Sequence, residues 1–208
     1  MIVEDDIYKT IEETYEGSFS EKRSKFVSLA IPVNSEEEVK SHLDELRKIY
    51  YDARHICWAY HIGTDEVKFR ANDDGEPSGT AGRPILGQIR SFELTDILIA
   101  VVRYFGGIKL GTGGLVVAYK AAAANALEQA VIVEKTINET VSITFEYPFM
   151  NEVMRIVKEM EPTILSQNFE MSCAMTLQIR RSQIELLRNR LSKVQSLLFV
   201  DEHDDTEI

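Results

Sequence analysis

The stretch VVRYFGGIKLGTGGLVVAY, residues 101–119, organises the interpretation of the whole chain. The apolar, largely β-branched run 97–102 leads into it and predicts a buried strand. The alanine-rich segment 115–130 contains no proline or glycine and predicts a helix, for which Thr112 is the natural N-cap. Five glycines lie between positions 106 and 114. This density indicates a backbone that needs positive φ or a very close approach to another group.

Two explanations of these glycines remain open. A glycine-rich loop between a strand and a helix can present free backbone N–H groups to an anion, aided by the helix dipole. Alternatively, the glycines let the helix pack tightly against neighbouring strands. Residues 106–112 lack the lysine of a P-loop, and the run from Gly111 fails the dinucleotide fingerprint at its last glycine. A nucleotide-dependent enzyme is therefore less favoured than either explanation.

Composition narrows the class of protein. A length of 208 residues suits one large domain or two small ones. The net charge of −11 argues against a general nucleic-acid coat protein but leaves room for a local basic patch. Two distant cysteines, Cys57 and Cys173, predict a reducing compartment and no zinc site. We find neither a leader nor an apolar run of membrane-spanning length, and expect a cytoplasmic protein with no membrane partner, metal or cofactor.

The first half of the chain alternates strand and helix signals. Residues 8–19 and 25–33 predict two strands, and Ser35 with Glu38 forms a capping-box pattern that opens a helix. The expected apolar face of that helix consists of Val39, His42, Leu43, Leu46 and Ile49.

The next predicted strand, RHICWAYHI at 54–62, has two faces. One face carries the two histidines with Cys57 and Ala59, and the other carries the large apolar residues. Side chains that follow one another on a strand face stand ~7 Å apart, too far for a nucleophile and base in direct contact. Histidines in a partly buried sheet face are favoured over a metal or Cys–His site.

A second special loop, at 72–82, follows a strand predicted at 66–71 and precedes a helix predicted at 84–91. Its carboxylates Asp73, Asp74 and Glu76 are suited to a divalent cation, but their spacing is not that of an EF-hand. Capping and pairing are favoured. We expect Arg103 to pair with one of the three, because an arginine after a buried strand is costly when unpaired.

Both special loops follow strands and open helices, so we expect them to share one face of the first domain. A phosphate is expected at the N–H groups of residues 112–114, with Lys109 as its side-chain partner. The candidate site for an anion or a partner comprises Asp73, Asp74, Gly75, Glu76, Gly79, Thr80, Gly82, Arg103, Gly106, Gly107, Lys109, Gly111, Thr112, Gly113 and Gly114.

The second half reads as a complete small domain of order βαββαβ, the ferredoxin-like signature. Ser182 and Glu185 form another capping-box pattern at its second helix. The acidic ends, 1–6 and 201–208, are expected to be frayed or mobile. A concentration of positive charge is a candidate RNA contact, although a solvated helix face is its usual meaning; it comprises Arg180, Arg181, Arg188, Arg190 and Lys193.

The segments DDGEPSGTAGRP at 73–84 and VVRYFGGIKLGTGGLVVAY at 101–119 resemble the paired signatures of the IMPACT/YigZ family. The resemblance implies an α+β protein of two domains. Residues 1–135 would form an IMPACT N-terminal-type domain similar to domain IV of elongation factor G, a ribosomal-protein-like two-layer α/β sandwich. Residues 136–208 would form a ferredoxin-like domain similar to domain V.

This relation implies a non-enzymatic protein that binds RNA, the ribosome or a translation-related protein. Eukaryotic relatives act in translational control with an additional domain that is not recognised in this chain, so their partner is not carried over. The alternative is an enzyme or binder acting on a phosphorylated small molecule or nucleotide at the glycine-rich loops. The first-domain fold is also similar to that of a kinase superfamily, but no catalytic acid or base is identified here. Nothing in the sequence predicts an oligomeric state.

Overall fold

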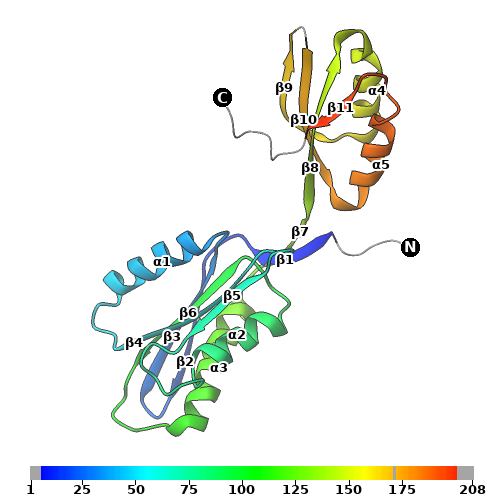
Figure 1. The fold of residues 1–208 in the computed structure, drawn as a ribbon. Coiled ribbons are helices and arrows are strands. Elements are labelled where there is room, and N and C mark those ends of the chain that lie inside the picture. The colour runs from blue at the N-terminus through cyan, green and yellow to red at the C-terminus, as the bar shows by residue number, and fades with distance from the viewer. Residues whose placement is uncertain (1–5, 171, 201–208) are drawn as a thin grey trace. The chain divides into compact units, whose positions relative to one another are not determined.

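A computed structural model describes residues 6–170 and 172–200, and the expectations for the two chain ends concern residues that lie largely outside this part. The chain divides into two compact units (Figure 1). One is Tyr8–Lys135, and the other combines the described residues from Thr136 onward with Asp6 and Ile7. Helices and antiparallel sheets make up both units, as the sequence predicted.

A five-stranded antiparallel sheet in the order β2-β3-β6-β4-β5 is the centre of the first unit. Its strands are β2 (Tyr15–Glu21), β3 (Ser24–Pro32), β4 (His55–Ile62), β5 (Lys68–Asn72) and β6 (Ile97–Tyr104). The central strand β6 is buried from Ile97 to Arg103, because both faces of the sheet are covered. Strand β6 therefore delivers Arg103 and the loop after it from the middle of the sheet.

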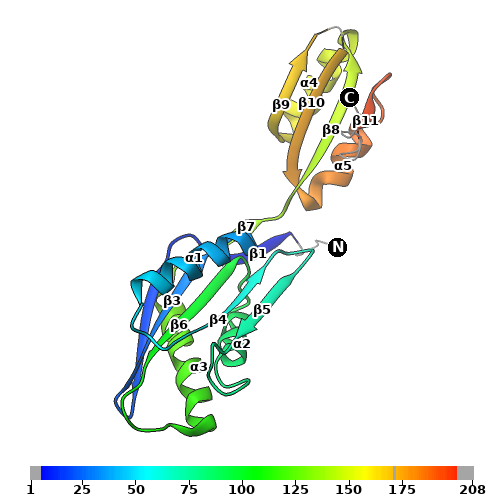
Figure 2. The ribbon, with the colours of Figure 1, turned by 60° about the vertical axis from the view of Figure 1, so that its left-hand side comes forward.

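Helices cover the two faces of this sheet (Figure 2). Helices α2 (Gly82–Ser91) and α3 (Gly111–Gln129) pack on one face, and α1 (Glu36–Ile49) packs on the other. On β4, Cys57 faces α2 and α3, whereas Ile56 and Tyr60 face the side of α1. The predicted division of that strand is confirmed, but the two-layer expectation is wrong. Since both faces of the strands are apolar, the sheet requires a helical layer on each side.

Several predicted boundaries need correction. The segment expected as one strand at 8–19 forms β1 (Ile7–Ile11) and β2, and β1 pairs with β7 (Ile132–Thr136). Helix α3 begins at Gly111 rather than after the glycines. Ile49, expected on the buried face of α1, is exposed because α1 ends there, beyond the edge of the apolar cluster.

The capping box of α1 is only partly formed as predicted. Ser35 Oγ accepts the Glu38 N–H at 3.1 Å, while the Glu38 carboxylate accepts the N–H of Asn34 at 2.8 Å instead of that of Ser35. Both bonds still satisfy donors at the start of the helix.

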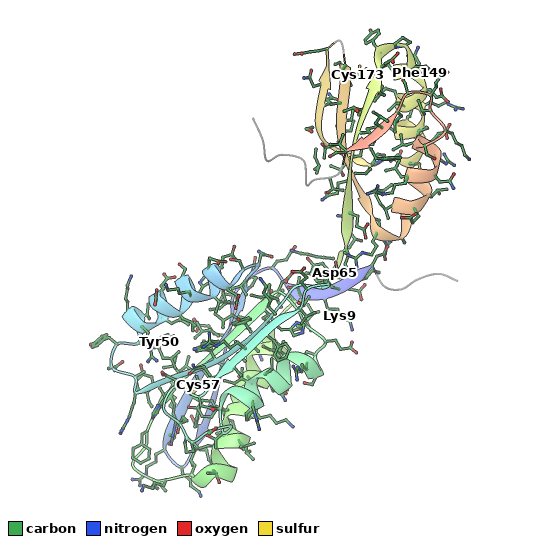
Figure 3. The ribbon with its side chains drawn as sticks, in the orientation of Figure 1. Lys9, Tyr50, Cys57, Asp65, Phe149 and Cys173 are labelled. Atoms are coloured by element: carbon green, nitrogen blue, oxygen red, sulfur yellow. The ribbon has the colours of Figure 1, made fainter. Side chains whose placement is uncertain are left out.

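The second unit has the predicted element order βαββαβ, and its sheet has the order β11-β8-β10-β9. Its elements are β8 (Asn138–Glu146), the 3₁₀ turn η1 (Tyr147–Phe149), α4 (Met150–Met160), β9 (Thr163–Phe169), β10 (Ser172–Arg180), α5 (Arg181–Leu191) and β11 (Leu198–Val200). Alternate residues of β8 and β10 pack with the inner faces of α4 and α5 to form the core. Figure 3 labels Cys173 on β10, one of these core residues.

The predicted capping box at Ser182 is wrong, because a carboxylate from the other end of the chain occupies that position. Asp6 accepts the N–H of Ser182 at 3.2 Å and two bonds from Arg180, at 2.7 and 2.9 Å. The Arg180 guanidinium, followed by the Ser182 bonds, lowers the pKa of Asp6 to about 2. The start of α5 is thus satisfied by a residue 174 positions from Arg180.

Candidate functional site

The two glycine-rich loops meet at a pocket of about 440 Å³ in the first unit. This confirms the prediction that they lie on one face. The lining consists of Arg54, His55, Glu76, Pro77, Arg103, Phe105, Lys109, Leu110, Gly111, Thr112 and Leu115. Five of the predicted site residues are in this lining, and the other predicted loop residues are not.

The first loop is held closed by Asp73. Its carboxylate accepts the N–H groups of Gly79, Ala81 and Gly82 at 2.7, 3.0 and 2.8 Å. Burial raises the pKa of Asp73, but the three N–H donors outweigh that effect and the net shift is downward. Thr80 is buried, and its hydroxyl donates to the Pro77 carbonyl at 2.6 Å. The loop therefore satisfies its own polar groups and opens α2.

Asp74 fixes the position of the neighbouring strand. Its Oδ2 accepts the N–H of Ile56 at 2.6 Å and is also bonded to Arg47. Its backbone carbonyl lies 2.7 Å from His55 Nδ1. Because a carbonyl only accepts, Nδ1 of His55 carries a proton and donates it to this bond.

Metal binding receives no support from these carboxylates. Among the residues that the structure describes, no group of three or more His, Cys, Asp and Glu side chains is arranged to hold a metal ion. His61, near the other end of β4, has its Nδ1 3.0 Å from Thr95 Oγ1. Both histidines of this strand are partly buried, as predicted, and their hydrogen-bonding partners lie in neighbouring loops.

A buried ion pair joins the two loops. Arg103 Nη1 lies 2.5 Å from Glu76 Oε1, and the two side chains are only 8% and 4% exposed. This confirms the expected pairing and identifies Glu76 as the partner. Tyr119 donates to the same Glu76 oxygen at 2.9 Å, and the Cys57 thiol lies 3.3 Å from the Tyr119 hydroxyl. Cys57 is labelled in Figure 3.

Burial keeps the Cys57 thiol and the Tyr119 hydroxyl of this network protonated. Burial raises the pKa of the Cys57 thiol to about 12. Burial also raises the pKa of Tyr119, with Cys57 and Glu76 adding to the effect. A thiol with such a pKa is not a nucleophile near neutral pH. The network has the character of a structural support for the pocket.

Helix α3 opens onto the pocket with its first two residues, Gly111 and Thr112. Its N-cap residue is Leu110 and no side chain caps it, so the prediction of Thr112 as the N-cap is wrong. The helix begins one residue before Thr112, which places that hydroxyl inside the first turn. The N–H groups of the first turn of a helix have no partner within the helix itself.

The five α-helices of the described residues differ at their N-termini. Helix α1 has Ser35 and three glutamates, and α4 has Glu152 in its first turn. Helices α2 and α5 lack an acidic first turn but receive the carboxylates of Asp73 and Asp6. In the described part of the chain, α3 alone has neither an acidic first turn nor a carboxylate from elsewhere. The positive end of the α3 dipole therefore has no carboxylate to neutralise it, and it faces the pocket.

Glycine is present at the positions of the second loop for different physical reasons. A side chain at Gly106 would collide with the backbone of Arg23, its Cβ 2.0 Å from the carbonyl carbon. Gly107 and Gly111 have φ of +86° and +74°, which disfavours other residues. A Cβ at Gly113 would meet nothing within 4 Å. Tight packing thus accounts for Gly106. For Gly113 the remaining explanation is that the backbone N–H groups are left open to an anion.

The charge of the pocket differs from that of the chain. Arg54, Arg103 and Lys109 line it against one carboxylate, Glu76, whereas the chain as a whole carries −11. Arg54, His55 and Phe105 were not among the predicted site residues. Arg54 directly precedes β4 and His55 is its first residue, both remote in sequence from the second loop, so only the pairing of β4 with β6 could have identified them.

The basic residues predicted in the second unit are engaged within that unit. Arg180 pairs with Asp6, Arg181 with Glu139, and Arg190 with Glu159. Arg188 lies over the ring of Phe199, 5.6 Å from its centroid. Lys193 is exposed. The carboxylates offset much of the positive charge, and a contact of these residues with RNA stays a prediction.

Comparison with known proteins assigns the family. The model of the Impact N-terminal domain matches residues 22–127. An IMPACT family member of Haemophilus influenzae is 34% identical over 180 residues, covering 84% of this chain and 86% of the relative. IMPACT family member YvyE of Bacillus subtilis is 35% identical over 152 residues, covering 73% and 70%. The chain belongs to the IMPACT family.

A solved structure extends the similarity over the whole fold. The crystal structure of a hypothetical protein superposes with a TM-score of 0.71 at 27% identity, covering 95% of this chain and 98% of that one. IMPACT family member YigZ of Escherichia coli is 34% identical over 151 residues, covering 72% of this chain and 74% of the relative. Among the described helices, none is both long and apolar enough to cross a membrane.

Proposed function

We propose that this protein binds RNA in the context of translation, through the pocket between the two glycine-rich loops. The observation that carries the proposal is the start of α3, a helix N-terminus without a carboxylate that opens into a pocket with three basic side chains. A phosphate group satisfies such a site twice, by accepting the free N–H groups and by pairing with the cations.

The distribution of charge supports a contact with RNA over a small part of the protein surface, not over a broad one. A chain of net charge −11 repels nucleic acid over most of its surface, so binding depends on the few places where cations gather. The first-unit pocket is such a place, and Lys109 is its most adaptable cation because its side chain is exposed on the loop. Few phosphate contacts imply weak, salt-sensitive binding.

The translation context rests on the family. Kinship with domains IV and V of elongation factor G, implied by the family resemblance, is part of the same proposal and is supported by the βαββαβ order of the second unit. On this proposal the protein acts in the cytoplasm, in keeping with two free cysteines. The proposed role is one of binding, and burial of the Cys57 thiol, which raises its pKa, argues against that thiol as a nucleophile.

The test is a titration of labelled single-stranded RNA, followed by fluorescence anisotropy at several salt concentrations. Lys109→Glu should weaken binding at least tenfold and reduce the salt dependence, whose slope is about −0.7 per phosphate contact for a single strand. Lys120→Glu is the matched control, since it makes the same charge change on the exposed face of α3 outside the pocket. Equal losses in both variants, or no binding at low salt, would reject the pocket as an RNA site.

Ribosomes provide a second arm of the test. Sedimentation of the protein with ribosomes through a sucrose cushion should be lost in Lys109→Glu and retained in Lys120→Glu. Charge reversal at Arg188 and Lys193 tests the predicted extension onto the second unit. It should weaken RNA binding and leave the binding of inorganic phosphate unchanged, because phosphate contacts only the first-unit pocket.

A phosphorylated small molecule or nucleotide is the second candidate, favoured by the shape of the site. A pocket of about 440 Å³ lies within the range of small-molecule sites, ~300–1,000 Å³. A ligand present at 100 times its dissociation constant should stabilise the fold by ~2.7 kcal/mol, which a thermal-shift screen of nucleotides and phosphosugars would detect. A screen without shifts, combined with RNA binding, would eliminate this candidate.

A further inference from the structure

Phe105 is an aromatic side chain left in solvent beside the pocket. It follows β6 directly, lines the pocket and is 56% exposed. A phenylalanine at a loop tip gains nothing for folding from that exposure. The Arg103 guanidinium lies 5.6 Å from the ring centroid of Phe105 and 5.5 Å from that of Phe26. Contact with Arg103 supports the ring at the edge of the pocket and leaves much of it open.

Arg103 itself has unused hydrogen-bonding capacity. The residue is 7% exposed and lines the pocket, and its Nε has no hydrogen-bond partner among the described residues. Only one of its nitrogens, Nη1, is bonded to Glu76. A buried polar atom without a partner calls for an explanation such as strain or a bound water or ion, and here it belongs to a guanidinium that lines the pocket. This observation is independent of the helix N-terminus.

Gly113 gives the same indication from the helix. It is not in the left-handed region and a Cβ there would meet nothing, so the fold does not require glycine. Alanine is the better helix former at such a position. Without a side chain, the backbone at the first turn of α3 is open to close approach by another molecule.

Beyond the pocket, further cations stand beside Phe105. The turn between β2 and β3 carries Lys22 and Arg23, both exposed. This turn lies against Gly106, because a Cβ on Gly106 would overlap the Arg23 backbone. The chain thus brings the turn that carries these two cations against the loop that carries Phe105.

We infer that the pocket and Phe105 together form a subsite for one nucleotide of single-stranded RNA. The phosphate lies at the start of α3 with Lys109 and Arg103, and the base stacks on the exposed face of Phe105. The strand continues over Lys22 and Arg23, which receive the next phosphate. This inference rests on the proposed function and specifies its ligand.

The geometry selects a single strand over a duplex. An unstacked base has a free face to lay on an aromatic ring, whereas the bases of a duplex are stacked on one another. Stacking of this kind tolerates any base, since every base has a π-face. We therefore expect little sequence preference and a strong preference for unpaired RNA.

The experiment compares variants of Phe105 by anisotropy with a labelled single-stranded RNA decamer. Stacking on an aromatic ring is worth ~1–3 kcal/mol per base, so Phe105→Ala should weaken binding roughly 5- to 150-fold. Phe105→Trp should retain it. Ile108→Ala is the matched control, because Ile108 is 45% exposed on the same loop and does not line the pocket. The melting temperatures of the variants should equal that of the parent, since both side chains are exposed.

A second readout tests stacking directly. The chain has one tryptophan, Trp58, and Phe105→Trp adds one at the subsite. RNA should quench the added fluorescence, while Ile108→Trp should show little quenching. A decamer of abasic residues should bind the parent and Phe105→Ala equally, because only the phosphate contacts remain.

The outcomes separate this inference from the proposed function. If RNA binds and Lys109→Glu weakens it while Phe105→Ala does not, the nucleotide subsite is wrong and the RNA site stands. If duplex RNA binds as tightly as the single strand, the subsite is likewise wrong. If no RNA binds, both proposals fail.

Discussion

The two glycine-rich loops of the first unit have similar compositions but different roles. In the loop that precedes α2, Asp73 takes up three backbone N–H groups and Glu76 is buried against Arg103. In the loop that precedes α3, no carboxylate meets the helix start. A loop with its own acceptor is closed, and a loop without one is available to a ligand. The difference lies in the carboxylates, since glycine is abundant in both.

The largest effect is expected from the ion pair that joins the loops. Arg103→Ala should lower the free energy of unfolding by ~3–5 kcal/mol, because Glu76 is then left buried without its partner. Chemical denaturation measures the loss. Arg103→Ala combined with Glu76→Gln should recover part of it, since the uncompensated charge is gone. An unchanged midpoint in the single variant would show that the two loops are not energetically linked.

The second-largest effect is expected when the side chain of Asp73, which accepts hydrogen bonds in the first loop, is removed and the loss of stability is compared with that of a change in the second loop. Asp73→Ala strands three donors at the start of α2 and should cost ~2–3 kcal/mol, whereas Thr112→Val should cost almost nothing because Thr112 caps no helix. Thermal denaturation of both variants makes the comparison. A large loss in Thr112→Val would mean that the α3 start depends on that hydroxyl after all.

Low pH should reduce the stability contributed at those helix N-termini that are bonded to a carboxylate, and not at the start of α3. The pKa of Asp6 is lowered to about 2, so its contribution to stability is fully present above its unfolded pKa of ~4 and is lost as the pH falls from there through about 2. Asp73 is expected to behave in the same direction. Denaturation at pH 6 and pH 3 should show a smaller acid-induced loss in Asp6→Asn than in the parent. Identical losses would contradict the assignment of Asp6 as a folded-state acceptor.

The smallest effect on stability is expected when the open helix is given its missing charge. Thr112→Asp places a carboxylate in the first turn of α3 and should raise the free energy of unfolding by ~0.3–1 kcal/mol. The same change should abolish phosphate and RNA binding. Thr112→Asn adds no charge and should leave phosphate binding and RNA binding nearly unchanged. Retained binding in Thr112→Asp would place the anion elsewhere.

Local patterns predicted the elements well where neighbouring residues decide the outcome. The two faces of β4 follow from alternation, and the apolar run at 97–102 lies in β6. The pairing of Arg103 was predictable because burying an unpaired guanidinium is costly. The paired loop motifs were also sufficient to indicate the family, which the comparisons then established.

The remaining features could not be predicted from the sequence, because they depend on contacts between residues that are far apart in the chain. Ser182 has the pattern of an N-cap, but Asp6 occupies that position from a distant part of the chain. The second helical layer was missed because an amphipathic α1 does not reveal which face of the sheet it covers. At the pocket, Arg54, His55 and Phe105 are in place only after β4 and β6 pair, since no local pattern relates the turn into β4 to the loop after β6.

The link between Asp6 and the start of α5 bears on the biosynthesis of the chain. Asp6 leaves the ribosome well before Arg180 and Ser182, because Asp6 and Arg180 are 174 positions apart in the sequence. The second unit therefore cannot reach its final state until the chain has been made as far as helix α5. A fragment that starts at residue 136 would lack this carboxylate and the acceptor of the Ile137 N–H, which is the Asp6 carbonyl. Completion of this unit thus waits for its own helix α5 to reach a segment that was synthesised much earlier.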